Sequence, residues 1–330
     1  MFGYLVRRVV SGLLVLFVVL AATFALFFYG PADPALSYCP ETHCTPQRLE
    51  TIRTALGLDQ PVLTQFGHYV EGIVAGNDFH AGTITIPCDA PCLGVSFKQR
   101  ADAAEYLWQR FPATLSVAVG ASVLFLVIGV GTGVWCARVR GSTLDKVIVS
   151  GSLFLNAMPY YLLILLSWLF LVSTWGVFPE SGYVPVTRDP VGWVKGMLLA
   201  WLVMGVVNAT SYTRFSRGSM VEAMNEEFVR TARAKGLSER RVTMRHALRA
   251  AIVPVVTIFG LDFAGLLSGT VFVEKIFDIH GIGAVSLSAI GQKDLPMISA
   301  TVLIAAAFVV AANLVVDLVY SLVDPRVRLS

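Results

Sequence analysis

Residues 226–257 read EEFVRTARAKGLSERRVTMRHALRAAIVPVVT and lead from a charged segment directly into a long apolar one. From Gly218 to Lys235 the apolar residues recur at helical spacing, which predicts an amphipathic helix. Gly236 is a typical left-handed helix stop, and Ser238 is placed to cap a second helix running through Ile252. The stretch therefore predicts a helix, a glycine corner and a second helix that enters a membrane.

The rest of the chain is strongly apolar. Its 330 residues are 55% hydrophobic and only 14% charged, far from the composition of a soluble domain. Crossing about 30 Å of hydrocarbon takes about 20 apolar residues, and six runs reach that length: 9–32, 111–137, 147–179, 196–213, 250–273 and 295–320. We predict an all-α integral membrane protein with six transmembrane helices.

The first apolar run follows Arg7 and Arg8, as the core of a cleavable signal does. It is longer than a signal core of about 7 to 15 residues, and Tyr29-Gly30-Pro31 is a poor cleavage site. We expect a retained helix at 1–32. An extracytoplasmic segment at 33–110 and a five-helix core at 111–330 follow it.

Orientation follows from the positions of Lys and Arg, because cytoplasmic loops keep the excess of basic residues. With the N-terminus inside, the cytoplasmic segments 1–8, 138–146, 214–249 and 321–330 hold 16 of the 25 basic residues and 6 of the 22 acids. Both termini are therefore expected to be cytoplasmic, and the loop 214–249 is the longest cytoplasmic one.

The extracytoplasmic segment contains four cysteines, Cys39, Cys44, Cys88 and Cys92. Outside the cytoplasm four cysteines favour two disulfides, for which three pairings exist. The local pairs Cys39–Cys44 and Cys88–Cys92 are preferred, because proline and aspartate between them suit tight turns. A zinc or iron–sulfur site with His43 is the alternative, which oxidation disfavours.

Two amphipathic helices are expected before the second span, one ending near Gly57 and the next beginning at Pro61. Residues 79–97 favour a loop or short strands. In the second span, Cys136 is expected to be a small apolar filler.

No phosphate-binding loop, zinc-protease motif or nucleophile elbow occurs. An ATPase site or other catalytic site in this chain is therefore not expected. Asn156 beside Met158-Pro159 predicts a kink in the third span, and the GxxxG patterns that begin at Gly129 and Gly265 favour close helix packing. Asp262 lies inside the fifth span, where a carboxylate is expected to face a cavity or another subunit. The alternative is an acid that neighbouring hydroxyls satisfy.

The stretch 228–237 mixes charges around a helix, which suits a groove in a partner protein better than a lipid surface, although a membrane-surface helix remains an alternative. Together with GTVFVEKIFDIHGIG at 269–283 and MFGYLVRRVVSGLLVLFVV at 1–19, the stretch 226–257 resembles the B-type permease subunit of bacterial dipeptide/oligopeptide ABC importers. The resemblance covers essentially the whole chain. It implies a type I importer permease fold in the cell membrane.

The resemblance also implies a role for the cytoplasmic loop, because its short helix matches the family's EAA motif, which docks into a cleft of the ATPase subunit. The implied docking residues are Phe228, Arg230, Thr231, Ala232, Arg233, Ala234, Lys235, Gly236 and Leu237. This chain departs from the broad family pattern in two places. Arg230 stands where the motif has an acid, and Arg249 stands where it has a proline.

The implied partners are a homologous second permease, two ATPase domains that bind ATP and Mg, and an extracytoplasmic substrate-binding protein; nucleic acid is not expected. Asp262, Glu274, Phe277 and Asp278 are candidates for the translocation pathway or outer gate. We expect no metal or cofactor in this chain. Peptides are the expected substrates, haem or nickel complexes an alternative.

A different class also remains open at this point, an ion-coupled secondary transporter in which Asp262 carries ions. Such folds often contain inverted repeats, and no convincing repeat is found in this sequence. A membrane-anchored sensor is a third possibility.

Overall fold

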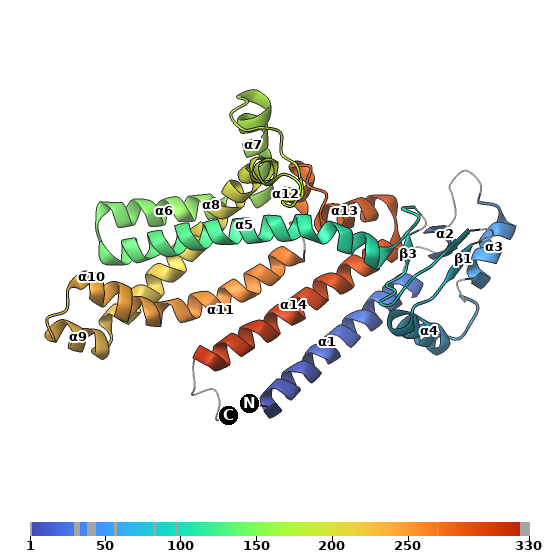
Figure 1. Cartoon of the computed structure of the whole chain (residues 1–330), viewed down its shortest axis with the longest axis horizontal. Coiled ribbons are helices and arrows are strands. Elements are labelled where there is room, and N and C mark those ends of the chain that lie inside the picture. Colours follow the sequence, from blue (N-terminus) through green and yellow to red (C-terminus); the bar gives the residue numbers. More distant parts are fainter. Residues whose placement is uncertain are drawn as a thin grey trace. The chain divides into compact units, whose positions relative to one another are not determined.

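A computed structural model describes residues 2–29, 34–37, 44–55, 58–81, 84–96, 98–268 and 270–323. The chain forms two compact units (Figure 1). The first unit comprises Met1–Pro112 and His280–Leu314, and the second comprises Ala113–Ile279 and Val315–Ser330. Because helices dominate and the strands of the described residues form only two small ribbons, the fold is all-α, as predicted.

The first unit joins long helices to a small mixed segment. Its elements are α1 (Phe2–Tyr29), α2 (Pro34–Ser37), α3 (Pro46–Ala55), α4 (Val62–Ala75), β1 (Phe79–Ala81), β2 (Ile84–Ile86), β3 (Val95–Ser96), β4 (Ala101–Asp102), the start of α5 (Ala103–Arg138), α13 (Ile282–Gln292) and most of α14 (Leu295–Val323). Strands β1 and β2 pair antiparallel, as do β3 and β4. The two predicted outer helices correspond to α3 and α4. Strands β1, β2 and β3 fall within 79–97, where a loop or short strands were expected, and β4 lies just beyond that range.

One polar contact links the strands of the first unit to a long helix. The Ser96 hydroxyl at the end of β3 hydrogen-bonds to the Asp294 carboxylate, and the Asp294 Oδ1 accepts from the Met297 backbone N–H at 3.4 Å. Asp294 thereby satisfies a free N–H at the start of α14. This contact ties β3 to the first turn of that helix.

The second unit contains the remaining helices. They are the rest of α5, α6 (Thr143–Ala157), α7 (Tyr160–Trp168), the π-helical turn η1 (Leu169–Thr174), α8 (Pro190–Asn225), α9 (Glu227–Ala234), α10 (Glu239–Arg241), the π-helical turn η2 (Val242–Ala247), α11 (Leu248–Leu267) and α12 (Val271–Ile276). The end of α14 also belongs to this unit.

Small residues let α5 and α8 approach closely. A Cβ on Gly129 would lie 2.9 Å from the Ala209 carbonyl oxygen, and one on Gly133 would lie 2.7 Å from that of Thr213. The first predicted GxxxG pattern therefore packs helix against helix. The second is not used in the same way within the described residues, because a Cβ on Gly265 would meet no atom within 4 Å.

Among the described residues, five helical segments are long and apolar enough to cross a membrane: Val6–Leu26, Ala103–Arg138, Pro190–Asn225, Glu239–Leu267 and Leu295–Val316. The third predicted span is broken, because α6 and the α7–η1 pair meet at 93°. The break falls at Met158-Pro159, where the kink was predicted. Counting this bent pair as one span gives six.

Candidate functional site

The charged stretch that leads into α11 is divided where the sequence predicts one helix. Glu226 has φ −66° and ψ 150°, an extended backbone that ends α8 at Asn225 and starts α9 at Glu227. The single helix predicted from Gly218 to Lys235 was therefore wrong. No proline or glycine marks the break, and its effect is to let α9 take a direction of its own (Figure 1).

The end of α9 follows the prediction more closely. Gly236 has φ +74°, a conformation that glycine adopts without strain, and its N–H donates to the Arg233 carbonyl at 2.9 Å. The predicted side-chain cap by Ser238 was wrong. Its carbonyl, and not its hydroxyl, accepts from the N–H groups of Arg241 and Val242.

One face of α9 is packed against the ends of the long helices. Val229 is fully buried and Ala232 is 4% exposed. They belong to one apolar cluster with residues from α5, α8, η2 and α11: Val134, Ala137, Met220, Ala223, Val242, Ala247 and Ala251. Packing of this kind holds α9 rigidly against the spans.

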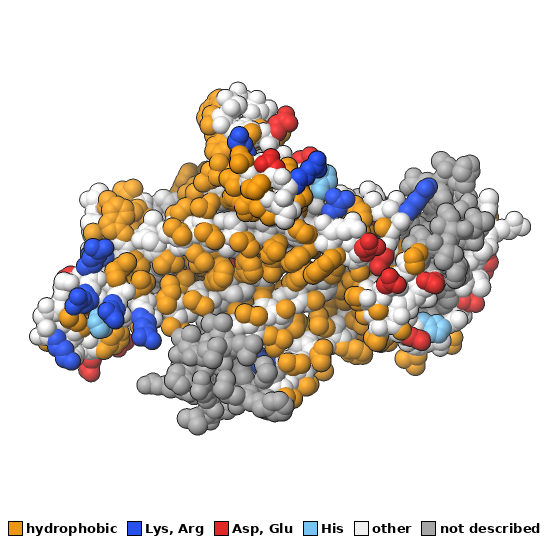
Figure 2. All heavy atoms as spheres, in the orientation of Figure 1, with side chains coloured by type: hydrophobic (Ala, Val, Ile, Leu, Met, Phe, Trp, Pro, Cys, Tyr) orange, Lys and Arg blue, Asp and Glu red, His pale blue; other side chains and the backbone are white. Residues whose placement is uncertain are grey.

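The opposite face of α9 is open. Of the nine expected docking residues, Ala232 is buried, Leu237 is half-buried and the other seven are exposed. Phe228 is a large apolar side chain that remains 45% exposed. Basic side chains gather over α9, α10 and η2 (Figure 2), where the exposed basic residues are Arg230, Arg233, Lys235, Arg240, Arg241 and Arg245.

Only part of this positive charge is paired inside the chain. The Arg233 Nε donates to the Glu239 Oε1 at 2.8 Å. Arg230 forms no ion pair with another described residue. The Arg230 guanidinium is therefore free to meet an acidic partner, whereas the Arg233 charge is already engaged.

Asp262 occupies an exposed position on α11. The Tyr212 hydroxyl on α8 donates to its Oδ2 at 2.8 Å. The Tyr212 side chain is itself buried, and its ring centroid lies 4.7 Å from that of Phe125 on α5. The sequence indicates Asp262 as a candidate, but no sequence signal points to Tyr212, which lies 50 residues away along the chain.

A second polar contact lies beside the break between α6 and α7. The Asn156 Nδ2 donates to the Thr210 Oγ1 at 3.2 Å and to the Ser211 Oγ at 2.9 Å, both on α8. Asn156 is exposed in this chain. The polar side chains of α8 at residues 210–212 thus contact α6 on one flank and α11 on the other.

Residues 274–278 divide between the interior and the surface of the second unit. The Glu274 carboxylate on α12 is fully buried and accepts from the Thr114 Oγ1 on α5 at 2.8 Å. Phe277 is 1% exposed and belongs to the main apolar cluster of the second unit. Asp278 is exposed, with φ +52°. Asp262 and Glu274 therefore bond to different helices, α8 and α5.

The family described as the binding-protein-dependent transport system inner membrane component matches residues 129–329, and its N-terminal companion matches residues 1–118. The chain belongs to this family. It is therefore a multi-pass membrane permease subunit, as its apolar helices also indicate.

Curated relatives of this permease extend over nearly its whole length. A Brucella abortus protein named for a peptide transport system permease is 34% identical over 328 residues, 99% of each chain. The dipeptide transport system permease protein of Escherichia coli is 33% identical over 329 residues, 93% of each chain. A peptide ABC transporter permease protein of Sinorhizobium fredii is 33% identical over 327 residues.

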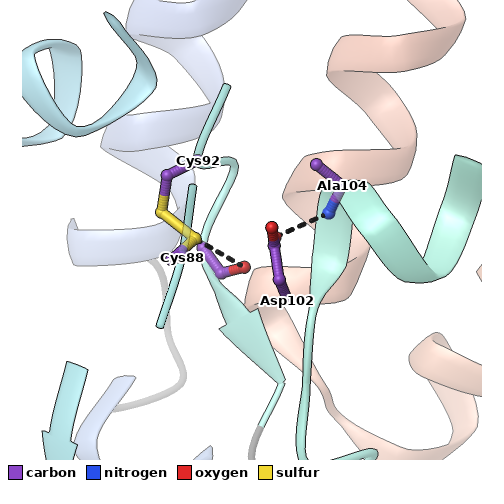
Figure 3. Close-up of a disulfide and its surroundings, with 5 residues drawn as sticks. Cys88, Cys92, Asp102 and Ala104 are labelled. Carbon is purple, nitrogen blue, oxygen red and sulfur yellow. Dashed lines mark hydrogen bonds between the residues drawn. A yellow bond between two sulfur atoms is a disulfide. The ribbon is translucent and has the colours of Figure 1, made fainter. Parts of the chain in front are cut away.

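The segment between the first two spans of the permease contains a disulfide between Cys88 and Cys92, which confirms that predicted pair (Figure 3). Both side chains are buried. Cys44 is also disulfide-bonded, but Cys39 lies outside the described residues, so the pair Cys39–Cys44 stays a prediction. Cys136 is a buried free thiol, as expected for a small apolar filler.

A carboxylate close to the disulfide caps the second span of the permease. The Asp102 Oδ1 accepts from the Ala104 N–H at 2.9 Å at the start of α5 (Figure 3). Burial raises the pKa of Asp102 above its usual value, against the lowering effect of this hydrogen bond.

Proposed function

We propose that this chain is a pore-forming permease subunit of an ATP-driven importer of di- and oligopeptides. The family match and the nearly full-length relatives named for peptide and dipeptide transport support this substrate class. In the proposed complex the chain pairs with a homologous permease. Two ATPase domains bind ATP and Mg and supply the energy, and an extracytoplasmic binding protein delivers the peptide.

The observation that carries the proposal is the two-sided character of α9. Its outer face presents Phe228 and Arg230 to a partner, and its inner face buries Val229 and Ala232 among the ends of α5, α8 and α11. A helix held this way moves together with the spans. ATP-driven closure of the ATPases would therefore displace α9 and reorient the spans around the pathway.

This role requires α9 to lie in the cytoplasm. The excess of Lys and Arg in the loop 214–249 supports that orientation, and it places both termini on the same side of the bacterial cell membrane. The four-cysteine segment then lies outside, where disulfides persist.

We assign Asp262 to the translocation pathway and residues 274–278 to the outer gate. A carboxylate at the centre of a spanning helix costs about 2.5–3.5 kcal/mol to insert, so an exposed Asp262 is expected to face water or another subunit. Buried Glu274 and Phe277 would anchor the outer segment, leaving Asp278 at its surface.

The test replaces Phe228 with aspartate in the complete complex. The charged side chain would enter an apolar cleft of the ATPase, so we expect loss of ATPase co-purification and of ATP-dependent dipeptide uptake in proteoliposomes. The matched control is Val186→Asp, since Val186 is equally exposed, at 44%, on a loop between spans. Phe228→Asp with normal association and uptake would exclude this docking role.

A further inference from the structure

Asp262 has an unused hydrogen-bonding oxygen. Its Oδ2 accepts the Tyr212 hydroxyl, and within the described part of the chain its Oδ1 receives no hydrogen bond and no basic side chain pairs with it. An ionised carboxylate in a span is retained where it has a specific partner or a functional role. The missing partner is therefore a cation or donor supplied from outside the described chain.

The Tyr212 hydroxyl is a fixed donor. Phe125 packs on the Tyr212 ring with centroids 4.7 Å apart, and the absence of a side chain on Gly129 leaves room for the Tyr212 Cβ. A carboxylate oriented by a rigid neighbour needs little reorganisation to bind a ligand. The second oxygen of Asp262 is held ready for a positively charged group.

Asp262, on α11, lies beside a part of α8 that carries several polar side chains. Residues 210–212 rise only about 3 Å along the helix axis, and their side chains contact Asn156 on one flank and Asp262 on the other. Asn156 and Asp262 are both exposed. Together these side chains form a polar surface on which the Asp262 carboxylate has no cationic partner among the described residues. Such a surface fits a ligand that has one positive group and several amide dipoles.

We propose that Asp262, oriented by Tyr212, binds the protonated amino group of a peptide as it crosses the membrane. The inference rests on the proposed function, because a peptide substrate supplies this ammonium group. The exposed amide at Asn156 provides a neutral polar surface at the same level. An inorganic cation is the competing ligand, and the experiments below separate it from the peptide.

The first experiment measures dipeptide uptake by proteoliposomes containing the complete complex. A hydrogen bond between charged groups is lost in Asp262→Asn, for which we expect a fall in uptake of about tenfold or more. Asp262→Glu retains the charge and should recover most of the uptake. Leu261→Asn is the matched control, since Leu261 is the adjacent exposed residue on α11.

Uptake by Asp262→Asn at the unmodified rate would overturn the assignment of Asp262, because the charge would then be dispensable. The same result would leave the importer itself intact. Absence of ATP-dependent peptide uptake in the unmodified complex would instead overturn the proposed function, so the two failures are distinguishable.

The second experiment tests access and ligand directly in the complex without its binding protein. Asn156→Cys, at the same level and with Asp262 intact, is introduced with Cys136→Ala. Labelling by a charged, membrane-impermeant thiol reagent is measured from both sides. We expect labelling that a free-amino dipeptide slows at least threefold and its N-acetylated form does not. The same cysteine combined with Asp262→Asn is the control, in which the free-amino dipeptide should no longer slow the labelling.

Three outcomes would overturn the proposal. Absence of labelling would show that water does not reach the level of Asn156 and Asp262. Equal protection by the free and N-acetylated dipeptides would remove the role of the ammonium group. Protection by sodium or potassium ions alone, with no added effect of the peptide, would assign the position to an inorganic cation.

Discussion

Arg217 and Asp145 form a two-pronged ion pair in the second unit. The Arg217 Nε donates to the Asp145 Oδ1 at 2.6 Å, and its Nη2 donates to Oδ2 at 2.7 Å. Asp145 Oδ2 also accepts from the Gly141 N–H, in the turn between α5 and α6. The pair therefore fastens this turn to α8, less than three helical turns before α9 begins.

Removal of one member of this pair should destabilise the second unit. The Asp145 side chain is 3% exposed, so Arg217→Ala leaves a buried carboxylate without its cation and should cost about 3 kcal/mol of unfolding free energy. Arg217→Lys keeps the charge but loses the two-pronged geometry. Its unfolding free energy should lie between those of Arg217→Ala and the unmodified protein. Thermal unfolding of the purified complex measures both, and equal stability of Arg217→Ala and the unmodified protein would contradict the expectation.

The close approach of α5 and α8 makes a second prediction with a built-in control. A Cβ on Gly129 would lie 2.5 Å from the Tyr212 Cβ and 2.9 Å from the Ala209 carbonyl oxygen, whereas one on Gly131 meets nothing within 4 Å. Gly129→Ala must push the helices apart and should cost about 1–3 kcal/mol. Gly131→Ala should be neutral, and equal unfolding temperatures for the two variants would show that the helices are not tightly packed.

Asp102 predicts a pH dependence of stability in the first unit. Burial raises the pKa of Asp102 in the folded chain, whereas an unfolded aspartate titrates near about 3.9. At pH values between the unfolded and the folded pKa, the folded state binds more protons than the unfolded state. The contribution of Asp102 to the unfolding free energy therefore rises as pH falls and levels off near the unfolded pKa. At neutral pH the ionised carboxylate lowers stability.

The measurement compares Asp102→Asn with the unmodified chain across this pH range. An asparagine keeps the oxygen that accepts from the Ala104 N–H and carries no charge. The asparagine variant should therefore be the more stable at neutral pH, with the advantage shrinking as pH falls. Asp102→Ala should be about 1 kcal/mol less stable than the asparagine variant at every pH, because it also lacks the cap. A stability advantage of the asparagine variant that grows toward acid pH would contradict a raised pKa for Asp102.

Local sequence signals predicted much of this fold. Apolar run length located the spans, Pro159 marked the broken third span, and Gly236 marked the end of α9. Each of these features is decided by residues within a few positions of it. The break at Glu226 was missed because no special residue marks it, and packing of Val229 against the spans offers a tertiary reason for it.

The polar contacts of the candidate site could not be predicted from the sequence. The Tyr212–Asp262 hydrogen bond joins residues 50 apart, and the Arg217–Asp145 pair joins residues 72 apart. Periodicity gives the face of a helix on which a residue lies, but not which residue of another helix it meets. Asp262 was identified as a candidate because a carboxylate in a span is costly, while its partner carries no such signal.

The disulfide in the first unit leads to the last prediction. Cys88 and Cys92 form a buried cluster with Val95 on β3, and β3 continues into the Ser96 contact with Asp294 at the start of α14. The bridge closes a very short loop, for which the chain-entropy relation gives about 2 kcal/mol. Its loss should therefore loosen β3 and the turn that follows it.

Trypsin can report on this loosening, because Lys98 and Arg100 are exposed in that turn. Replacing both Cys88 and Cys92 with serine should raise the cleavage rate there roughly tenfold or more, since about 2 kcal/mol less stability raises the open population by that factor. Cys136→Ala, which removes a thiol outside any disulfide, is the control and should leave cleavage unchanged. Unchanged cleavage in the double serine variant would mean that the contact with α14 alone holds β3 in place.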